Sequence, residues 1–298
     1  MSKKHVSGFV TLIGRPNVGK STLLNAFIGE KVSIISDKIQ TTRHTIHGIV
    51  DDDTSQVIFI DTPGIHKPKH RLGTYMVDVS FQSLQDVDVV LFLINATEGY
   101  GKGDAYILEQ LNKLSSPIFL VINKVDLIEP KDLFPLIDQY KDTCNFEEIV
   151  PVSALNGNNV EKLLSLIKEH LPEGPKYYDP EQRTDKPKSF LYSEIIREKV
   201  LHYTKEEIPH SINVLIESIE ERGNTSLYMQ ALIITERQSQ KGILIGKGGN
   251  MLKQIGKEAR KELEEMTGKK VFLDLWVKVE RDWRNRQGIL KQYGFSVD

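Results

Sequence analysis

Short apolar runs separated by amphipathic segments characterise the first part of the chain. The runs at 57–60, 117–122 and 149–152 contain no alternation of apolar and polar residues, and they are too short for buried helices. Such runs are typical of strands that are buried on both faces of a parallel sheet. Residues 22–27 and 160–167 have the spacing of amphipathic helices. The pattern therefore predicts an α/β domain in which helices flank a mixed, mostly parallel sheet.

The pattern changes after a segment at 172–187, which contains four prolines and almost no aliphatic residue. This composition is typical of a linker. Beyond it we expect a helix, two strands with alternating apolar residues, two helices joined by a glycine-rich turn, and a final strand at 271–279. This order predicts an α+β domain. The 298 residues are thus expected to form an α/β domain at 1–175, a linker at 176–189, and an α+β domain with a C-terminal helix at 190–298.

Residues 14–21 have the sequence G-x-x-x-x-G-K-S and lie between an apolar run and the start of a helix. A phosphate-binding loop requires this context, because its backbone N–H groups and the helix N-terminus surround the phosphates. Lys20 is expected to contact the β- and γ-phosphates, and Ser21 is expected to bind Mg²⁺. The nucleotide-binding residues expected here are Gly14, Arg15, Pro16, Asn17, Val18, Gly19, Lys20, Ser21 and Thr22.

The base of the bound nucleotide is predicted from Asn123, Lys124 and Asp126, which follow the second apolar run. Asp126 would lie near the carboxyl end of that strand, where open α/β sheets bind ligands. Its carboxylate can accept two hydrogen bonds from guanine, whereas adenine would leave it unpaired at a high cost. Ser153 and Ala154 follow the next strand and are placed to donate a backbone N–H to the guanine O6. An ATP-dependent kinase is the alternative if Asp126 does not contact guanine.

A further segment, Asp61-Thr62-Pro63-Gly64, follows the run at 57–60 and is expected to bind nucleotide. Asp61 would hold Mg²⁺, and the Gly64 N–H would contact the γ-phosphate, a contact that is lost on hydrolysis. A threonine in the polar loop at 40–43 would complete the magnesium ligands, and we favour Thr42 over Thr41. The predicted magnesium ligands are Ser21, Thr42 and Asp61.

The glycine-rich turn of the second domain has the sequence Gly246-Lys247-Gly248-Gly249. It matches the G-x-x-G signature of a KH domain, whose backbone holds about four nucleotides of single-stranded nucleic acid. Residues 237–261 carry seven basic side chains and one acidic side chain, an excess that favours phosphate binding. The order of elements resembles the type II KH arrangement. The residues expected to contact RNA are Ile243, Ile245, Gly246, Lys247, Gly248, Gly249 and Lys253, with the isoleucines as an apolar floor for bases.

The nucleotide segments, in this order, resemble the translation-factor-like GTPases. The residues around 14–25, 40–43, 61–65 and 123–126 narrow the resemblance to the bacterial Era family, in which one type II KH domain follows the GTPase domain. The resemblance covers essentially the whole chain. It implies binding of GTP and GDP with Mg²⁺, hydrolysis of GTP, and binding to the 3′ region of small-subunit ribosomal RNA during assembly of the 30S subunit. It also implies that Asn17 helps to hold a potassium ion.

Ile65 occupies the position where many small GTPases carry a glutamine that orients the attacking water. An isoleucine cannot hydrogen-bond water, so hydrolysis is expected to be slow or to depend on another group. The expected catalytic groups are Lys20, Asn17, Thr42 and Gly64. The competing hypothesis is an RNA-binding docking module whose nucleotide domain changes conformation with negligible turnover.

Composition constrains the compartment. The net charge is −2, the hydrophobic content of 39% is sufficient for two ordinary cores, and the single cysteine, Cys144, excludes an internal disulfide. These features fit a reducing cytoplasm. No run approaches about 18 uninterrupted apolar residues, so no membrane span is expected. We expect a C-terminal surface helix anchored by Trp283, Ile289 and Leu290, whose basic side chains could contact RNA or, peripherally, the inner face of the cell membrane. We expect a cytoplasmic monomer.

Overall fold

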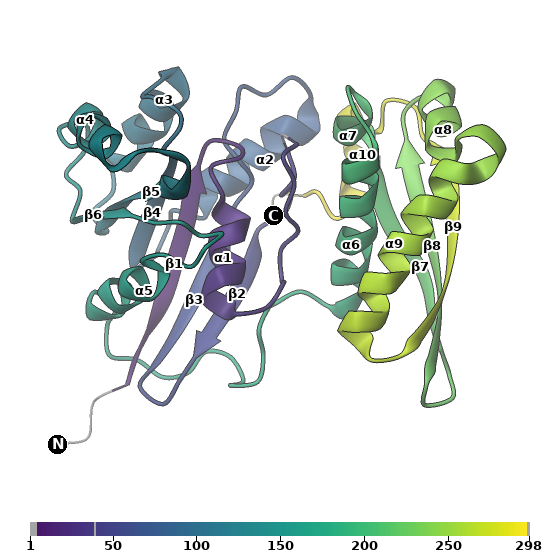
Figure 1. Cartoon of the computed structure of the whole chain (residues 1–298), viewed down its shortest axis with the longest axis horizontal. Helices are drawn as coiled ribbons and strands as arrows, with labels where there is room; N and C mark the ends of the chain where they lie inside the picture. Colours follow the sequence, from purple (N-terminus) through teal and green to yellow (C-terminus); the bar gives the residue numbers. More distant parts are fainter. Residues whose placement is uncertain (1–4, 39, 297–298) are drawn as a thin grey trace.

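The structure is a computed structural model of the chain and describes residues 5–38 and 40–296. Within these residues, two sheets with their own helices lie side by side (Figure 1). The first sheet has six strands in the order β2-β3-β1-β4-β5-β6, and the second has three in the order β7-β8-β9. An α/β domain followed by an α+β domain is therefore confirmed as the fold class.

The first sheet is parallel except for its edge strand β2, which runs antiparallel to β3. Its strands are β1 (Val6–Gly14), β2 (Ile46–Asp51), β3 (Ser55–Asp61), β4 (Val89–Asn95), β5 (Ile118–Asn123) and β6 (Glu148–Pro151). Every residue of β3, β4 and β5 is buried, which explains why their sequences show no alternation.

Helices cover both faces of this sheet. The helices are α1 (Lys20–Ile28), α2 (Arg71–Gln82), α3 (Lys102–Leu111), α4 (Pro130–Tyr140) and α5 (Val160–Glu169), with a 3₁₀ helix η1 (Val125–Leu127). One core cluster contains side chains of α1 and α5, and a second cluster on the opposite face contains side chains of α3 and α4. The carboxyl ends of β1, β3 and β5 lead into the predicted nucleotide segments, so the sheet brings these segments to one edge.

The second sheet packs against helices on one face. Its elements are α6 (Lys188–Tyr203), α7 (Ile208–Ser211), β7 (Asn213–Arg222), β8 (Ser226–Thr235), α8 (Gln238–Ile245), η2 (Lys247–Gly249), α9 (Asn250–Thr267), β9 (Lys270–Val279), η3 (Trp283–Asn285) and α10 (Gln287–Gln292). Side chains of α6, α8 and α9 share one core cluster with the inward residues of the strands. Because α6 begins at Lys188, the predicted linker at 176–189 overlaps its first two residues.

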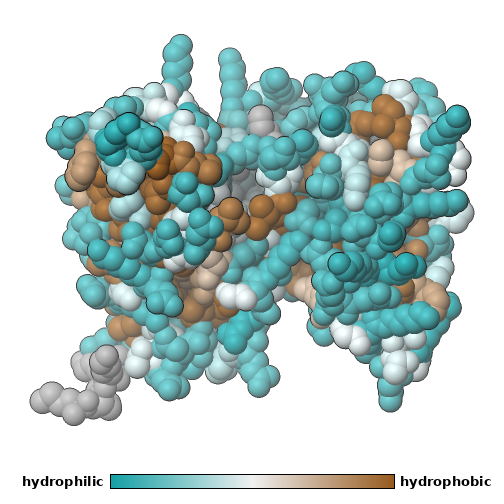
Figure 2. All heavy atoms as spheres, viewed as in Figure 1, coloured by the Kyte–Doolittle hydropathy of each residue, from teal (hydrophilic) through white to brown (hydrophobic). Residues whose placement is uncertain are grey.

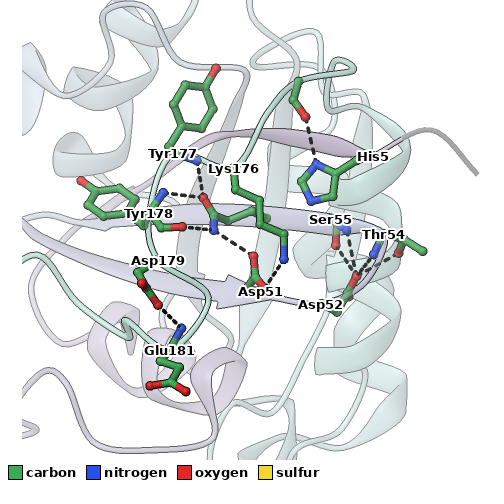
Figure 3. Close-up of polar contacts among 12 residues, drawn as sticks. His5, Asp51, Asp52, Thr54, Ser55, Lys176, Tyr177, Tyr178, Asp179 and Glu181 are labelled. Carbon is green, nitrogen blue, oxygen red and sulfur yellow. Dashed lines mark hydrogen bonds and ion pairs between the residues drawn. The ribbon is translucent and has the colours of Figure 1, made fainter.

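The linker lies along the edge of the first sheet (Figure 3). Lys176 forms an ion pair with Asp51 of β2, with 2.6 Å between Nζ and Oδ2. The buried Gln56 of β3 accepts hydrogen bonds from the N–H groups of Tyr177 and Tyr178 and donates to the Tyr178 carbonyl. Backbone contacts further along the linker cover the exposed edge of β2. These contacts fix the proline-rich linker along the edge of the sheet, although its composition is typical of a flexible tether.

A fourth core cluster joins the two domains. Leu72 and Met76 of α2 pack with Ile234 of β8 and with the C-terminal residues Trp283 and Phe295. The predicted C-terminal helix is divided into η3 and α10, and Trp283, one of its expected anchors, is fully buried, with its Nε1 donating to the Ser211 carbonyl at 2.8 Å. A buried indole needs such an acceptor. None of the helices in the described residues has the length and apolar character needed to cross a bilayer.

Candidate functional site

The predicted phosphate loop connects β1 to α1 and lines a cavity together with the loop that precedes β2. The lining residues come from the phosphate loop, from residues 34–42 and from the end of the β3 loop; they are Pro16, Asn17, Gly19, Lys20, Ser21, Thr22, Ile34, Ile35, Ser36, Gln40, Thr41, Thr42 and Gly64. Gly19 has φ +94°, and a Cβ there would lie 2.2 Å from the Asn123 amide. Only glycine therefore fits between the phosphate loop and the β5 loop.

Lys20 is buried at the first position of α1, and its Nζ donates to the carbonyls of Gly14 and Arg15 at 3.3 and 3.1 Å. Burial lowers the pKa of the Lys20 ammonium to about 8, and the nearby Asp61 carboxylate opposes this shift. A lysine held at a loop that presents backbone N–H groups is suited to bind phosphate oxygens, which would supply the negative charge it lacks.

Three side chains predicted to bind magnesium converge from three separate segments. The Ser21 hydroxyl donates to Asp61 Oδ2 at 2.7 Å and lies 2.9 Å from the Thr42 hydroxyl. The Thr42 hydroxyl is 3.5 Å from the same carboxylate oxygen. The Thr41 hydroxyl instead donates to the Lys38 carbonyl. The geometry therefore favours Thr42 over Thr41 as the magnesium ligand.

The donor set fits a hard divalent cation. Asp61 is fully buried, burial raises the pKa of its carboxyl group, and its Oδ1 has no hydrogen-bond partner among the described residues. Among the described residues, no three or more His, Cys, Asp and Glu side chains are grouped closely enough to hold a metal ion by themselves. A site of two hydroxyls and one carboxylate needs further oxygen ligands from phosphate and water, which is how Mg²⁺ is usually bound beside nucleotides.

Gly64 packs directly on the phosphate loop, since a Cβ at this position would lie 2.6 Å from Pro16 Cα. The next residue, Ile65, donates its N–H to the Gly14 carbonyl at 3.1 Å and buries its side chain in the core. The residue in the usual glutamine position therefore points away from the cavity and cannot orient a water molecule there.

The predicted base-binding segments are tied together by Asn123. Its Nδ2 donates to the Val18 carbonyl at 2.8 Å, and its Oδ1 accepts from the backbone N–H groups of Lys124 and Ala154 at 2.8 and 3.0 Å. Lys124 Nζ donates to the Asn17 carbonyl at 2.7 Å, so this lysine bridges the two loops. Asp126 lies exposed in η1. Its predicted contact with guanine, and that of the Ala154 N–H with the guanine O6, stay predictions.

Several residues of the predicted set do not face the cavity. Val18 is fully buried, the Thr62 hydroxyl donates to the Leu12 carbonyl within the sheet, and the Pro63 carbonyl accepts from Ser80. Ser153 is fully buried as well. Their predicted role in nucleotide binding would depend on backbone groups and stays a prediction. Asn17 has φ +62°, and its Nδ2 donates to the Asp37 carbonyl at 2.7 Å, so its predicted role at a potassium ion stays a prediction.

Arg15 also turns away from the phosphates. It is ion-paired with Glu98 and with the buried Asp104, where Nη1 and Oδ2 are 3.2 Å apart. A Cβ on Gly103 would lie 2.9 Å from Arg15 Cδ, so the start of α3 is shaped around this side chain. Arg15 thus anchors the phosphate loop to α3.

Sequence reasoning did not single out the pair formed by Gln40 and His66. Their Nε2 atoms are 2.8 Å apart, and His66 Nδ1 lies 2.9 Å from the Gly64 carbonyl. The carbonyl requires a proton on Nδ1, so Nε2 of the neutral ring accepts from the Gln40 amide. Gln40 Oε1 is then buried, with no partner in the described part of the chain, beside a cavity that Gln40 and Gly64 both line. Nothing in the sequence around Gln40 indicates that its side chain lies beside the cavity.

Sequence reasoning also did not identify the contacts between the 31–43 loop and the second domain. Arg43 is 2% exposed, and its guanidinium donates to the carbonyls of Ile212, Pro209 and His210 at 2.5, 3.1 and 3.3 Å. Arg197 of α6 donates to the Thr41 carbonyl.

A second contact lies earlier in the same loop. Glu198 of α6 accepts from the Ile35 N–H at 3.0 Å and from Lys31 Nζ at 2.6 Å. The loop that carries Thr42 is therefore held by α6 and α7 of the second domain. The position of Arg43 directly after the predicted magnesium ligand Thr42 is the one signal in the sequence for this contact. Its partners cannot be predicted, because they lie far away in the sequence.

The glycine-rich turn of the second domain lies between α8 and α9. Gly246, Gly248 and Gly249 have φ values of +71°, +61° and +78°, a conformation that favours glycine. A Cβ at Gly248 would meet nothing within 4 Å, whereas one at Gly246 would lie 2.7 Å from Met251 Cβ. The turn therefore presents open backbone at Gly248.

The other residues predicted to contact RNA surround this turn. Lys247 and Lys253 are exposed, and Ile243 on α8 is 53% exposed. Ile245 is partly buried against the domain core, so it offers less surface than expected. Whether any of these residues touches RNA stays a prediction.

Comparison with known proteins places both halves of the chain. The 50S ribosome-binding GTPase family matches residues 9–124, and the KH domain family matches residues 207–284. A crystal structure of Era in complex with MgGDPNP and nucleotides 1506-1542 of 16S ribosomal RNA is 44% identical in sequence and superposes with a TM-score of 0.95. A point variant of Aquifex aeolicus Era bound to GDP and AlF4⁻ gives the same identity and TM-score.

In both cases the alignment covers 98% of this chain and 100% of the other. Likeness at this identity and over nearly the entire length shows common ancestry as well as a common fold. The α/β domain with its phosphate loop is a GTPase domain, the α+β domain is a KH domain, and the chain belongs to the Era family of GTPases.

Proposed function

We propose that this protein binds GTP and GDP with Mg²⁺, hydrolyses GTP, and uses the bound nucleotide to control binding of its KH domain to the 3′ region of small-subunit ribosomal RNA during 30S assembly. The crystal structure of a 44% identical Era with MgGDPNP and 16S ribosomal RNA nucleotides supports both ligands. The protein acts in the cytoplasm. The burial of Trp283 removes the aromatic anchor that favoured membrane contact, so we do not extend the proposal to the membrane.

One observation carries the link between the two activities: neighbouring residues of one loop contact different domains. Thr42 lies at the predicted magnesium site with Ser21 and Asp61, while Arg43 is buried among carbonyls of the KH domain. A loop this short cannot move one residue without moving the other. Ligation of magnesium by Thr42 and docking of Arg43 therefore stabilise the same arrangement.

Hydrolysis would weaken this arrangement. With GTP bound, Gly64 and Thr42 have a γ-phosphate and its magnesium ion to contact, and both contacts are lost in the GDP state. The 31–43 loop then loses its support on the nucleotide side, and the KH domain loses the docking point at Arg43. GTP should accordingly favour the domain arrangement seen here, and RNA that prefers this arrangement should bind more tightly with GTP.

Side chains around the nucleotide cavity can also promote GTP hydrolysis without a glutamine at position 65. Lys20 would bind the β- and γ-phosphates, and bound Mg²⁺ would neutralise charge on the same oxygens. Gln40 Oε1, positioned by His66, is a buried acceptor with no partner among the described residues and is suited to hold the attacking water. This arrangement favours a turning-over GTPase over a docking module with negligible turnover.

The test is the affinity of the full chain for a single-stranded fragment from the 3′ end of small-subunit ribosomal RNA, at one salt concentration, with GDPNP and then with GDP. Tighter binding with GDPNP supports a GTP-controlled RNA clamp. Equal affinity would contradict the coupling, and no binding in either state would contradict the RNA target.

Turnover is tested separately by multiple-turnover phosphate release from GTP in potassium buffer. Release that is lost in Lys20→Ala supports the GTPase. Absence of release with potassium, with sodium and with added RNA would instead support the docking module.

A further inference from the structure

The three-stranded KH sheet has two faces, and only one is fully covered. Helices α6, α8 and α9 pack on the inner face, which carries Leu227, Met229, Ala231 and Ile233 of β8. In Figure 1 these helices lie in front of the sheet, so its outer face points away from the viewer. Among the described residues, α2 and the C-terminal segment cover that outer face only at the end around Ile234, including Leu215 and Leu232. In this part of the chain, the rest of the face is open to solvent.

The open part carries a regular pattern of rings and charges on β9. Lys270, Phe272, Asp274, Trp276 and Lys278 alternate with inward apolar residues, so they share the outer face. Phe272 and Trp276 are 47% and 61% exposed, which is unusual for large aromatic side chains. The apolar alternation of this strand predicts its inward positions and gives no indication of a role for the outward ones.

Each exposed ring is oriented by a neighbouring charged group. Lys270 Nζ lies 5.5 Å from the centre of the Phe272 ring, and the Trp276 Nε1 donates to Asp274 Oδ2 at 3.0 Å. Tyr228 of β8 lies directly across from Phe272 in the parallel register, and the Arg222 guanidinium is 4.2 Å from its ring centre. These contacts limit the orientations of the rings, so the rings form an ordered aromatic surface.

This surface is continuous with the element that leads into the glycine-rich turn. A groove of about 570 Å³ runs from Gln238 and Lys241 at the start of α8 to Trp276 and Lys278 on β9. α8 ends at the turn itself, where Gly246 begins the G-x-x-G sequence. A strand that leaves the turn can follow this groove around the free edge of β9 onto the outer face.

We propose that the open outer face of the KH sheet is a second RNA-contacting surface, on which Phe272 and Trp276 stack bases of the strand that leaves the glycine-rich turn. This inference rests on the proposed RNA binding of the KH domain. Aromatic rings on an open sheet are suited to stack unpaired bases, and flanking lysines are suited to the phosphates between them. Four residues along β9 separate the rings by about 13 Å, so they would take bases that are not adjacent in an extended strand.

The charges favour RNA over a protein as the occupant. Lys241, Lys270 and Lys278 lie along the groove and the open face, where they outnumber the acidic Glu217 of the groove and Asp274 of β9. Lys278 Nζ also lies 3.5 Å from Glu280 Oε2. Asp274, an acidic group between the two rings, is already engaged by the indole of Trp276. A protein partner is retained as an outcome of the test.

The experiment compares two RNA fragments from the 3′ region of small-subunit ribosomal RNA with the full chain bound to Mg²⁺ and GDPNP. One fragment has about six nucleotides, enough for the groove of a KH domain, and the other has about sixteen. The double variant Phe272→Ala/Trp276→Ala should bind the long fragment at least tenfold more weakly and the short fragment as the wild type does. Trp276→Phe, which retains a ring, should restore most of the affinity. Phe134→Ala removes a still more exposed ring, 73% exposed, from the GTPase domain and should change neither affinity.

Fluorescence gives a second readout that a structural effect would not mimic. The chain has two tryptophans, and Trp283 is fully buried. The long fragment should therefore quench the fluorescence of the exposed Trp276, and the short fragment should not.

Equal affinity of the double variant and the wild type for the long fragment would overturn the proposal. If the double variant kept that affinity but lost binding to assembled 30S subunits, the surface would contact a ribosomal protein instead, and the proposal would be wrong. If neither fragment bound the wild type, the proposed RNA function itself would fail.

Discussion

Replacement of Arg43 by alanine tests the proposed path between nucleotide and RNA. Arg43→Ala removes three hydrogen bonds from a charged donor to KH-domain carbonyls, two of which are 3.1 Å or shorter. Hydrogen bonds to charged groups contribute about 1.5 to 3 kcal/mol each, and the cost of burying the guanidinium offsets part of this. We expect a net loss of about 3 kcal/mol of domain docking.

That loss matches the whole of a typical coupling free energy, which is about 1 to 3 kcal/mol or roughly 5- to 150-fold in affinity. The ratio of RNA affinities with GDPNP and with GDP should therefore fall to within about twofold of one. Nucleotide affinity should change little, because Arg43 points away from the cavity. Arg43→Lys should be intermediate, since an ammonium keeps the charge but cannot reach several carbonyls in the same plane.

The assay is a titration of labelled RNA with wild type and variants in each nucleotide state. Arg71→Ala is the matched control, because this exposed arginine lies at the same domain boundary and only its 3.5 Å contact with Gln287 is lost. It should keep the wild-type ratio. If Arg43→Ala also kept that ratio, coupling would not pass through this residue.

Four further predictions concern single residues. Asp126→Asn should lower the affinity for GDP about a hundredfold and reduce the preference for GDP over ADP in nucleotide competition. Unchanged selectivity would contradict the predicted contact of Asp126 with guanine. Gly248→Asp should weaken RNA binding more than tenfold with GDPNP affinity retained, because a Cβ fits there but a carboxylate repels phosphate; normal RNA titration would refute it. Gln40→Ala should lower kcat about tenfold to a hundredfold with little change in KM, and an unaltered kcat would exclude Gln40 from water positioning. His70 accepts a hydrogen bond from the Gly73 N–H at the start of α2, and burial lowers its pKa to about 4. The unfolded state therefore takes up the proton first, so stability should fall by about 1 kcal/mol, after discounting for solvent exposure, as pH drops from 6.5 towards 4. His70→Asn should keep the cap and abolish this loss in urea unfolding, and an identical pH slope would contradict it.

The sequence supports the fold class and the nucleotide segments because both depend on local chemistry. A buried parallel strand needs an unbroken apolar run, and a phosphate loop needs small residues, a lysine and a hydroxyl within eight positions. The glycine-rich turn is equally local, since its positive φ values favour glycine. The strands that carry these segments end at one edge of a parallel sheet, so the meeting of Ser21 with Asp61 also follows from a short-range pattern.

The predictions that were wrong or missing concern side chains whose surroundings come from distant parts of the chain. The sequence predicts that Trp283 anchors a C-terminal helix, but not that it packs on α2 and donates to the Ser211 carbonyl. The linker has the composition of a free tether, yet Gln56 inside the sheet holds it. Polarity along the chain cannot report these contacts, because it reflects each residue rather than what packs on it.

What the sequence determined by itself is therefore the chemistry of each half: a nucleotide loop on a parallel sheet and a glycine-rich turn between two helices. Only the tertiary structure decided how the halves meet. Arg43 and Ile212 are 169 positions apart, and nothing local marks them as partners. Their contact exists because a buried guanidinium must find carbonyl acceptors, and the folded KH domain presents them where the loop at 31–43 passes.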